Sequence, residues 1–280
     1  MTLHALGMVI ALAQTPADAP PVYFGIVYHV ADGSADGIPG WYQAGAFRDA
    51  NTAEPFALHI RLHGTSSDGR SVSVVIDSTH PRHAFAQGAY TVHVEPPIAR
   101  RTDVSILFWE GPASPRVLPS DHPMLDTATA TILIPQARRL VRLALDEADS
   151  SMVAPHDTVL FDHPYVTRLA QAPGFEVIEY HAVFKKGRHV ADGRGSVFFL
   201  YSPPDRRIVF SNFGHPEWSP TSEHVFAMSP RFFFSIDGDP HVYLLCVYYR
   251  AWESMGKWVV VDAQTGRPLT QALIPLGGWP

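Results

Sequence analysis

The last third of the chain, residues 196–262, constrains the fold more than any other stretch. Short runs of aromatic and β-branched residues alternate there with clusters of Gly, Pro, Asp and Ser. Such clusters end strands, and runs this short and this rich in Phe, Val and Tyr favour strands over helices. The runs are SVFFLYS, RRIVFSN, EHVFAMS, RFFFSID, VYLLCVYY and KWVVVDA. The pattern predicts an architecture of sheets but points to no particular reaction.

Residues 22–110 predict a first antiparallel β unit. In the segment 56–63, the apolar residues Leu58, Ile60 and Leu62 alternate with polar ones, which places them on one face of a strand. The turn 66–69 ends in Asp-Gly between two alternating runs and predicts a hairpin. Short strands with regular turns favour a sandwich-like domain. The expected strands are 22–30, 56–63, 71–77, 89–95 and 103–109.

Residues 111–151 are expected to form a Pro-rich linker followed by one helix, at 134–149. Apolar residues share one face of this helix, and Pro135 suits its first turn. Arginines stand early and acidic residues late, against the helix dipole, so a strand with Val141, Leu143 and Leu145 on one side is the alternative. The chain as a whole is predicted to be mainly β, with at most one substantial helix.

Residues 152–280 are expected to form a second β-rich domain, sandwich-like or propeller-like. The dipeptide His-Pro recurs at separations of 42, 41 and 52 residues, close to the period of propeller blades. The alternative interpretation is that His-Pro ends strands, because the residue before a proline is forced into an extended conformation. The four pairs begin at His80, His122, His163 and His215.

The N-terminal residues 1–21 read as a signal peptide and a leader. A short apolar run ends in the small residues Ala11 and Ala13, which is typical of a secretory cleavage site, although Lys and Arg are missing from the start. The protein is therefore expected in the periplasm or outside the cell, with the cytoplasm as the alternative. No later run has the roughly 18 apolar residues of a membrane helix, so no transmembrane segment is predicted.

Charge and motifs exclude several classes of function. The net charge is −6 and no basic cluster is longer than two residues. Nucleic acid is therefore not expected as a partner, because binding it requires a concentrated basic face. No cofactor is predicted: the Gly-rich stretch 192–196 stands between two strands and reads as a hairpin turn, not as a phosphate-binding loop. The single cysteine, Cys246, lies in an apolar strand and is expected to be buried and inert.

Several histidines and acids could carry chemistry. His59 and His63 share a face of the expected strand but lie roughly 13 Å apart, too far to bind one metal ion. The loop with His80 and His83, joined by Asp77, is a closer set. Two Asp-His neighbours flank a strand, at 156–157 and 162–163, and could form a pair for general-base chemistry. Acids next to tryptophans, as sugar-binding sites have them, are Glu110, Glu217 and Glu253.

The leading hypothesis is a non-enzymatic binding protein of the bacterial envelope, an inhibitor or immunity-type protein that blocks a toxin or hydrolase. Its expected partner is a protein, with a basic surface that suits the acidic chain. The expected contact is the loop 215–220 with its tryptophan and two prolines. One alternative is a carboxylate-based or metal-dependent hydrolase with its site between the two β parts; another is a structural or assembly component. The partner-binding candidates are His215, Glu217, Trp218 and Glu223.

Overall fold

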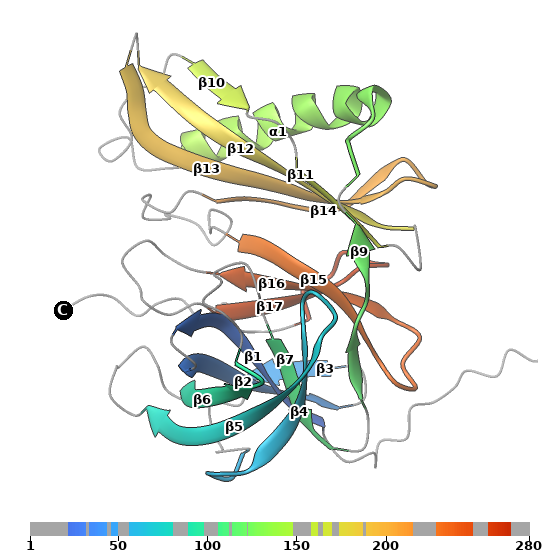
Figure 1. Ribbon diagram of the computed structural model, residues 1–280. Coiled ribbons are helices and arrows are strands. Elements are labelled where there is room, and N and C mark those ends of the chain that lie inside the picture. Colours follow the sequence, from blue (N-terminus) through green and yellow to red (C-terminus); the bar gives the residue numbers. More distant parts are fainter. Residues whose placement is uncertain are drawn as a thin grey trace, which may run out of the picture.

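The computed structural model describes most of the chain between residues 22 and 269. The described residues are 22–31, 34–43, 46–49, 56–80, 89–97, 106–111, 114–121, 123–147, 158–161, 165–169, 174–186, 189–214, 228–248 and 257–269. Within them lie many antiparallel strands and a single helix (Figure 1). The prediction of a mainly β chain with at most one substantial helix is confirmed.

The N-terminal strands form a sheet that closes on itself. Along the sheet the order is β1-β7-β4-β5-β6-β2-β3, and β1 also pairs with β2, so that six strands make a ring and β3 extends it. The ring encloses an apolar core that includes Phe56, Val74, Ile76 and Phe108, all buried. The strands are β1 (Val22–Ala31), β2 (Ser34–Gln43), β3 (Ala46–Asp49), β4 (Arg61–Ser66), β5 (Ser71–His80), β6 (Ala89–Glu95) and β7 (Ile106–Glu110).

This closed sheet replaces the sandwich-like domain expected for residues 22–110. Ring closure depends on β2, which pairs with β1 on one side and with β6 on the other. The sequence of β2 contains Gly37, Pro39 and Gly40, residues that usually mark loops. A strand was therefore not expected there, and without it the N-terminal strands could not close into a ring.

The expected strand 56–63 begins later than its alternation predicts. His59 has a positive φ of 64° and lies in a turn, so β4 starts only at Arg61. The turn breaks the expected apolar face: Leu58 is 46% exposed, whereas Leu62 is buried in the ring. The predicted hairpin at 66–69 is confirmed, with Gly69 at φ 82° between β4 and β5.

The remaining strands form two further sheets, here called sheet B and sheet C. Sheet B has the order β17-β16-β15-β8, from β8 (Pro115–Val117), β15 (Met228–Ile236), β16 (Val242–Tyr248) and β17 (Lys257–Asp262). Sheet C has the order β14-β13-β12-β11-β9, with β10 also paired to β12. Its strands are β9 (Ser120–Asp121), β10 (Thr158–Phe161), β11 (Tyr165–Leu169), β12 (Glu176–Lys186), β13 (His189–Ser202) and β14 (Arg207–Gly214).

The Gly-rich stretch 192–196 is not the hairpin turn that its glycines predict. It lies inside β13, where residues 194–196 pair with β12 and Asp192 and Gly193 fall at a register shift between the two strands, so the turn prediction is wrong. The His-Pro pairs, in contrast, do coincide with strand ends. His80 is the last residue of β5, and β9, β10 and β14 each end one or two residues before the other pairs. This agrees with the restriction that proline imposes on the residue before it.

Sheet B lies between the closed sheet and sheet C, and the helix covers the outer face of sheet C (Figure 1). Both faces of sheet B are therefore buried. Phe232, Phe234 and Tyr243 pack towards the closed sheet, and Phe233 and Leu244 pack towards sheet C. Burial on both faces explains why the central parts of β15, β16 and β17 are unbroken apolar runs, at 232–234, 242–248 and 258–261, instead of alternating sequences.

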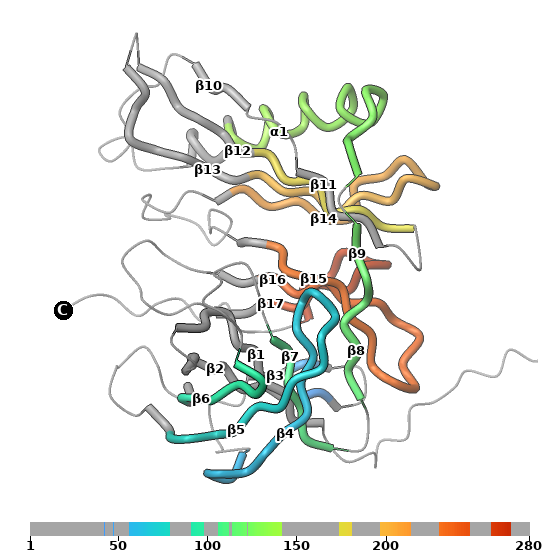
Figure 2. Tube along the Cα trace, in the orientation of Figure 1, coloured from blue at the N-terminus to red at the C-terminus, as the bar shows by residue number. Residues whose placement is uncertain are grey.

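The segment expected to be a linker contributes strands to both sheets. Residues 114–121 run along one side of the stack, past sheet B to sheet C, and supply β8 and β9 (Figure 2). Helix α1 (Thr127–Glu147) follows, capped by Asp126, whose carboxylate accepts both the backbone N–H and the hydroxyl of Thr129. The helix thus starts seven residues before the expected 134–149, and Pro135 lies inside it instead of in its first turn.

A tight turn follows β17. Gly266 adopts a φ of 72°, and its amide donates to the Asp262 carbonyl oxygen at 2.8 Å. A Cβ added at Gly266 would lie 2.1 Å from the carbonyl oxygen of Val209, in β14. Glycine is therefore required twice at this position, once for the positive φ and once for the close approach to sheet C.

Gly266→Ala should destabilise the protein far more than Gly69→Ala. Both glycines have a positive φ, but an added Cβ at Gly69 meets nothing within 4 Å. Gly69→Ala should cost about 1–2 kcal/mol, the penalty for a left-handed alanine, and Gly266→Ala at least about 2 kcal/mol more, because β14 has to move. Urea denaturation measures both. Equal losses would show that the turn does not press on β14.

Candidate functional site

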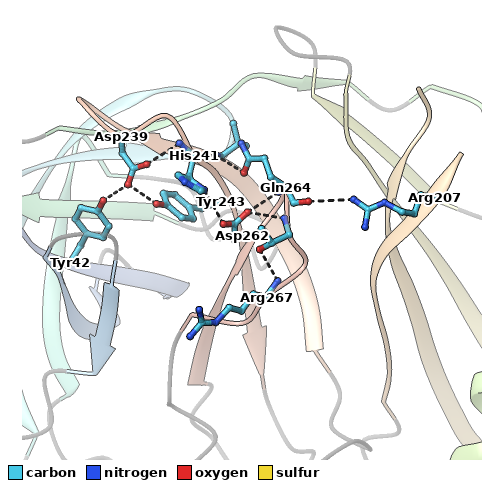
Figure 3. A network of polar contacts seen from close by, with 10 residues as sticks. Tyr42, Arg207, Asp239, His241, Tyr243, Asp262, Gln264 and Arg267 are labelled. Carbon is cyan, nitrogen blue, oxygen red and sulfur yellow. Dashed lines mark hydrogen bonds and ion pairs between the residues drawn. The ribbon is translucent and has the colours of Figure 1, made fainter. Parts of the chain in front are cut away.

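A network of polar contacts joins the closed sheet to sheet B (Figure 3). Its first centre is Asp239, in the turn between β15 and β16. One carboxylate oxygen, Oδ2, accepts the hydroxyls of Tyr42, from β2, and of Tyr243, from β16, the latter at 2.6 Å. The other oxygen accepts the backbone N–H of His241 at 2.9 Å. Three donors on one carboxylate fix this turn against the N-terminal part of the chain.

The second centre is Asp262, at the end of β17. Its Oδ1 accepts the backbone N–H groups of Gln264 and Thr265, at 2.8 Å and 3.0 Å. Its Oδ2 lies 2.9 Å from Nδ1 of His241. The side chain is only 7% exposed, so most of its hydrogen-bonding capacity is met by the protein itself. Asp262 both caps the turn and holds the histidine ring.

His241 lies between the two carboxylates. Its backbone is bonded to Asp239 and its ring to Asp262, and the ring stacks on that of Tyr243 with an interplanar angle of 16°. The side chain nevertheless remains 46% exposed. The result is an oriented imidazole that is held on one side and accessible on the other, an arrangement suited to moving a proton.

The aromatic groups around this network are tightly packed. The ring of Phe47 lies 4.9 Å from that of Tyr243 and 5.9 Å from that of Phe234. Burial, reinforced by the hydrogen bond to Asp239, raises the pKa of the Tyr243 hydroxyl well above its usual range. Tyr243 therefore stays protonated at any physiological pH and acts as a hydrogen-bond donor, not as a base.

The network also reaches sheet C. The amide oxygen of Gln264 accepts the backbone N–H of Val242, and its backbone carbonyl lies 3.5 Å from the Arg207 guanidinium of β14. Two loop residues of sheet B, His241 and Gln264, thus stand at the place where all three sheets meet (Figure 3). This junction is the candidate site.

The four partner-binding candidates lie outside the described residues, in the segment 215–227. They are His215, Glu217, Trp218 and Glu223. The structure does describe the two strands that this segment joins. β14 ends at Gly214 in sheet C and β15 begins at Met228 in sheet B.

Of the metal candidates, the structure describes the pair His59 and His63 but not the complete set of His80, His83 and Asp77. His59 lies in a turn and His63 on β4, where its ring is 6.4 Å from that of Trp109. Asp77 is exposed on β5, and within the described residues no three His, Cys, Asp or Glu side chains are grouped so that they could hold a metal ion. The members of the other sets that lie outside the described residues are His83, His156, Asp157, Asp162, His163, Glu217 and Glu253.

The remaining acid candidate, Glu110, is exposed at the end of β7 next to the half-buried Trp109. In the described part of the chain, no helix combines the length and apolarity that crossing a membrane requires. Asp239 and Asp262, which build the junction, were not among the candidates found from the sequence. Asp262 and His241 form no local motif, because 21 positions that include β16 and β17 separate them.

No family model matches the chain, and neither a curated protein nor a solved structure is similar enough to count as a match. The function must therefore be argued from the residues and the geometry of this chain alone.

Cys246 should be unreactive in the folded protein. It is fully buried between sheets B and C, and this burial, with the charge of Glu179 adding to it and that of Arg231 opposing it, raises the pKa of the thiol well above its usual value. A thiol reagent should label the native chain slowly, with no acceleration between about pH 7 and 9, where ordinary thiols ionise. Urea should expose one thiol per chain. Rapid native labelling, absent from Cys246→Ser, would contradict the burial.

Proposed function

We propose that this chain is a protein-binding protein of the bacterial envelope, of the inhibitor or immunity type, and that it blocks a basic toxin or hydrolase through the segment 215–227. The segment offers an aromatic anchor and negative charge in Trp218, Glu217 and Glu223. Tryptophan is among the most frequent anchors of protein interfaces. The acidic residues match a basic partner, on which they act mainly through the rate of association.

The observation that carries this proposal is the packing of the two strands that the segment joins. The segment connects β14 to β15, and these strands belong to two sheets that face each other. Both strands are firmly packed near the segment: Phe213 is buried under α1, and Phe232 and Phe233 are buried on opposite faces of sheet B. Binding residues are frequently carried on connections positioned by such a rigid frame.

The composition of the segment adds to this argument. Pro216 and Pro220 flank Glu217 and Trp218. Each proline fixes its own φ and restricts the residue before it, which lowers the entropy lost when the segment is ordered on a partner. His215 stands next to the end of β14 and completes the set of candidate contacts.

The envelope location is the second part of the proposal. It is supported by the apolar run and the small residues Ala11 and Ala13 at the N-terminus. Fractionation of cells that produce the full chain, followed by N-terminal sequencing, tests it. A mature protein that starts near Gln14 in the periplasm is the expected result. An uncleaved chain in the cytoplasm would support the alternative location.

Trp218→Ala should weaken partner binding while leaving stability nearly unchanged. The partner is first recovered by affinity purification of the wild-type chain from its source organism and then used in purified form. We expect affinity to fall by about 2 kcal/mol or more, as at an interface anchor. Calorimetric titration and thermal melting of the same samples separate binding from folding.

Trp109→Ala provides the matched control. Trp109 packs against the core between the closed sheet and sheet B. Its removal should therefore lower the melting temperature, with a loss of unfolding free energy of at most roughly 3–5 kcal/mol, as for a truncated aromatic residue. Affinity should not change while the variant stays folded. If Trp218→Ala instead behaves like this control, losing stability and keeping affinity, the segment is part of the frame and the binding proposal fails.

A further inference from the structure

We propose that His241 and Asp262 form an acid–base pair that catalyses the hydrolysis of acyl esters by water at the junction of the three sheets. This activity is separate from partner binding, because none of its residues lies in the segment 215–227. In short, His241 is the catalytic base, and Asp262 is the positioning residue that holds its ring.

The tautomer of His241 follows from its partner. Oδ2 of Asp262 can only accept a hydrogen bond, so Nδ1, 2.9 Å away, carries the ring proton. The neutral ring then has its lone pair on Nε2, the nitrogen that can take a proton. The stacking on Tyr243 restricts rotation of the ring further, and the backbone bond to Asp239 fixes the main chain that carries it. The base is therefore preorganised before any substrate binds.

Other groups at the junction are poorly placed to move a proton. The carboxylate of Asp239 is occupied by two tyrosine hydroxyls and one backbone N–H. That of Asp262 is occupied by two backbone N–H groups and the His241 ring. Neither matches the pair of available carboxyls that hydrolysis of a glycosidic bond uses. A single oriented imidazole instead suits attack of water on a carbonyl carbon.

The reaction step balances with water as the only second reactant. Nε2 of His241 takes a proton from a water molecule while the water oxygen forms a bond to the acyl carbon. The tetrahedral intermediate then collapses and the bond from that carbon to the leaving oxygen breaks. The imidazolium returns its proton to the leaving oxygen, which gives an alcohol and a carboxylic acid and restores the neutral ring.

The decisive variant is Asp262→Asn. Asparagine keeps an oxygen that can accept the N–H groups of Gln264 and Thr265, so the turn can be retained. Its NH₂ group then faces Nδ1 of His241 and donates to it. This moves the ring proton to Nε2 and removes the base without removing the ring. His63→Gln is the matched control, because His63 is an exposed histidine on a different sheet.

The experiment measures hydrolysis of p-nitrophenyl acetate by the full chain, with thermal melting and ¹⁵N NMR of the His241 ring on the same variants. We expect saturable hydrolysis by the wild type and by His63→Gln. His241→Gln should abolish it, and Asp262→Asn should lower kcat by about 10²–10⁴-fold with little change in KM. The NMR spectra should show a proton on Nδ1 in the wild type and on Nε2 in Asp262→Asn.

Three results would overturn the proposal. The first is hydrolysis by the wild type no faster than by His241→Gln. The second is unchanged kcat in an Asp262→Asn variant whose ring has the switched tautomer. The third is a wild-type ring that carries its proton on Nε2. If Asp262→Asn does not fold, His241→Gln and the wild-type spectrum still decide the question. Loss of partner binding in Trp218→Ala has no bearing on any of these results.

Discussion

Burial of sheet B on both faces is the constraint on which the other features depend. A strand with two apolar faces has no solvent side for polar residues, and β15, β16 and β17 accordingly carry unbroken apolar runs at 232–234, 242–248 and 258–261. The sheet must then be covered twice. Sheet C covers one face, and the closed sheet, through Tyr42, Phe47 and Leu107, covers the other. The three-sheet stack follows from the composition of these central strands.

The polar residues of sheet B that build the junction lie at strand ends and in turns, outside these apolar runs. Asp239 and His241 lie in the turn before β16, and Asp262 is the last residue of β17. These turns are adjacent, so both carboxylates bind His241: Asp239 binds its backbone N–H and Asp262 binds its ring. The histidine thereby links the two turns. Tyr42 and Arg207 then connect this group to the closed sheet and to sheet C. The junction is thus a direct result of two-sided burial in the strands that lead to it.

Local patterns in the sequence predicted part of the strands, but not β8, β9, β11 and β12, and they did not predict how the sheets assemble. Apolar runs indicated β13 to β17, and the Asp-Gly turn before β5 was found from its two residues, because strand and turn signals act over a few positions. β2 was missed because Gly37, Pro39 and Gly40 read as a loop, and only its pairing with both β1 and β6 makes it a strand. The start of α1 was missed because it depends on the Asp126 cap, while the apolar stripe begins later.

The candidate site was beyond the reach of local patterns for a related reason. His241 and Asp262 are 21 positions apart and meet only because β16 and β17 pair in register. Histidines that do look grouped in the sequence, such as His59 and His63, are separated by a turn with positive φ. Closeness in the sequence therefore did not predict which side chains interact. The tryptophan and the acids of 215–227 could be proposed from the sequence because that proposal rests on residue types alone and not on side-chain contacts.

The aromatic layer between the closed sheet and sheet B makes the two halves of the chain mutually dependent. Phe47 lies against Phe234 and Tyr243, which are separated from it by nearly two hundred residues of sequence. The strands before residue 111 and those after residue 114 pair only within their own sheets in the described part of the chain. If the chain were cut between these two residues, each fragment would keep its own strand pairing but lose the cover of one apolar face. Such fragments are expected to reassemble when mixed, which makes the protein a natural candidate for a split reporter.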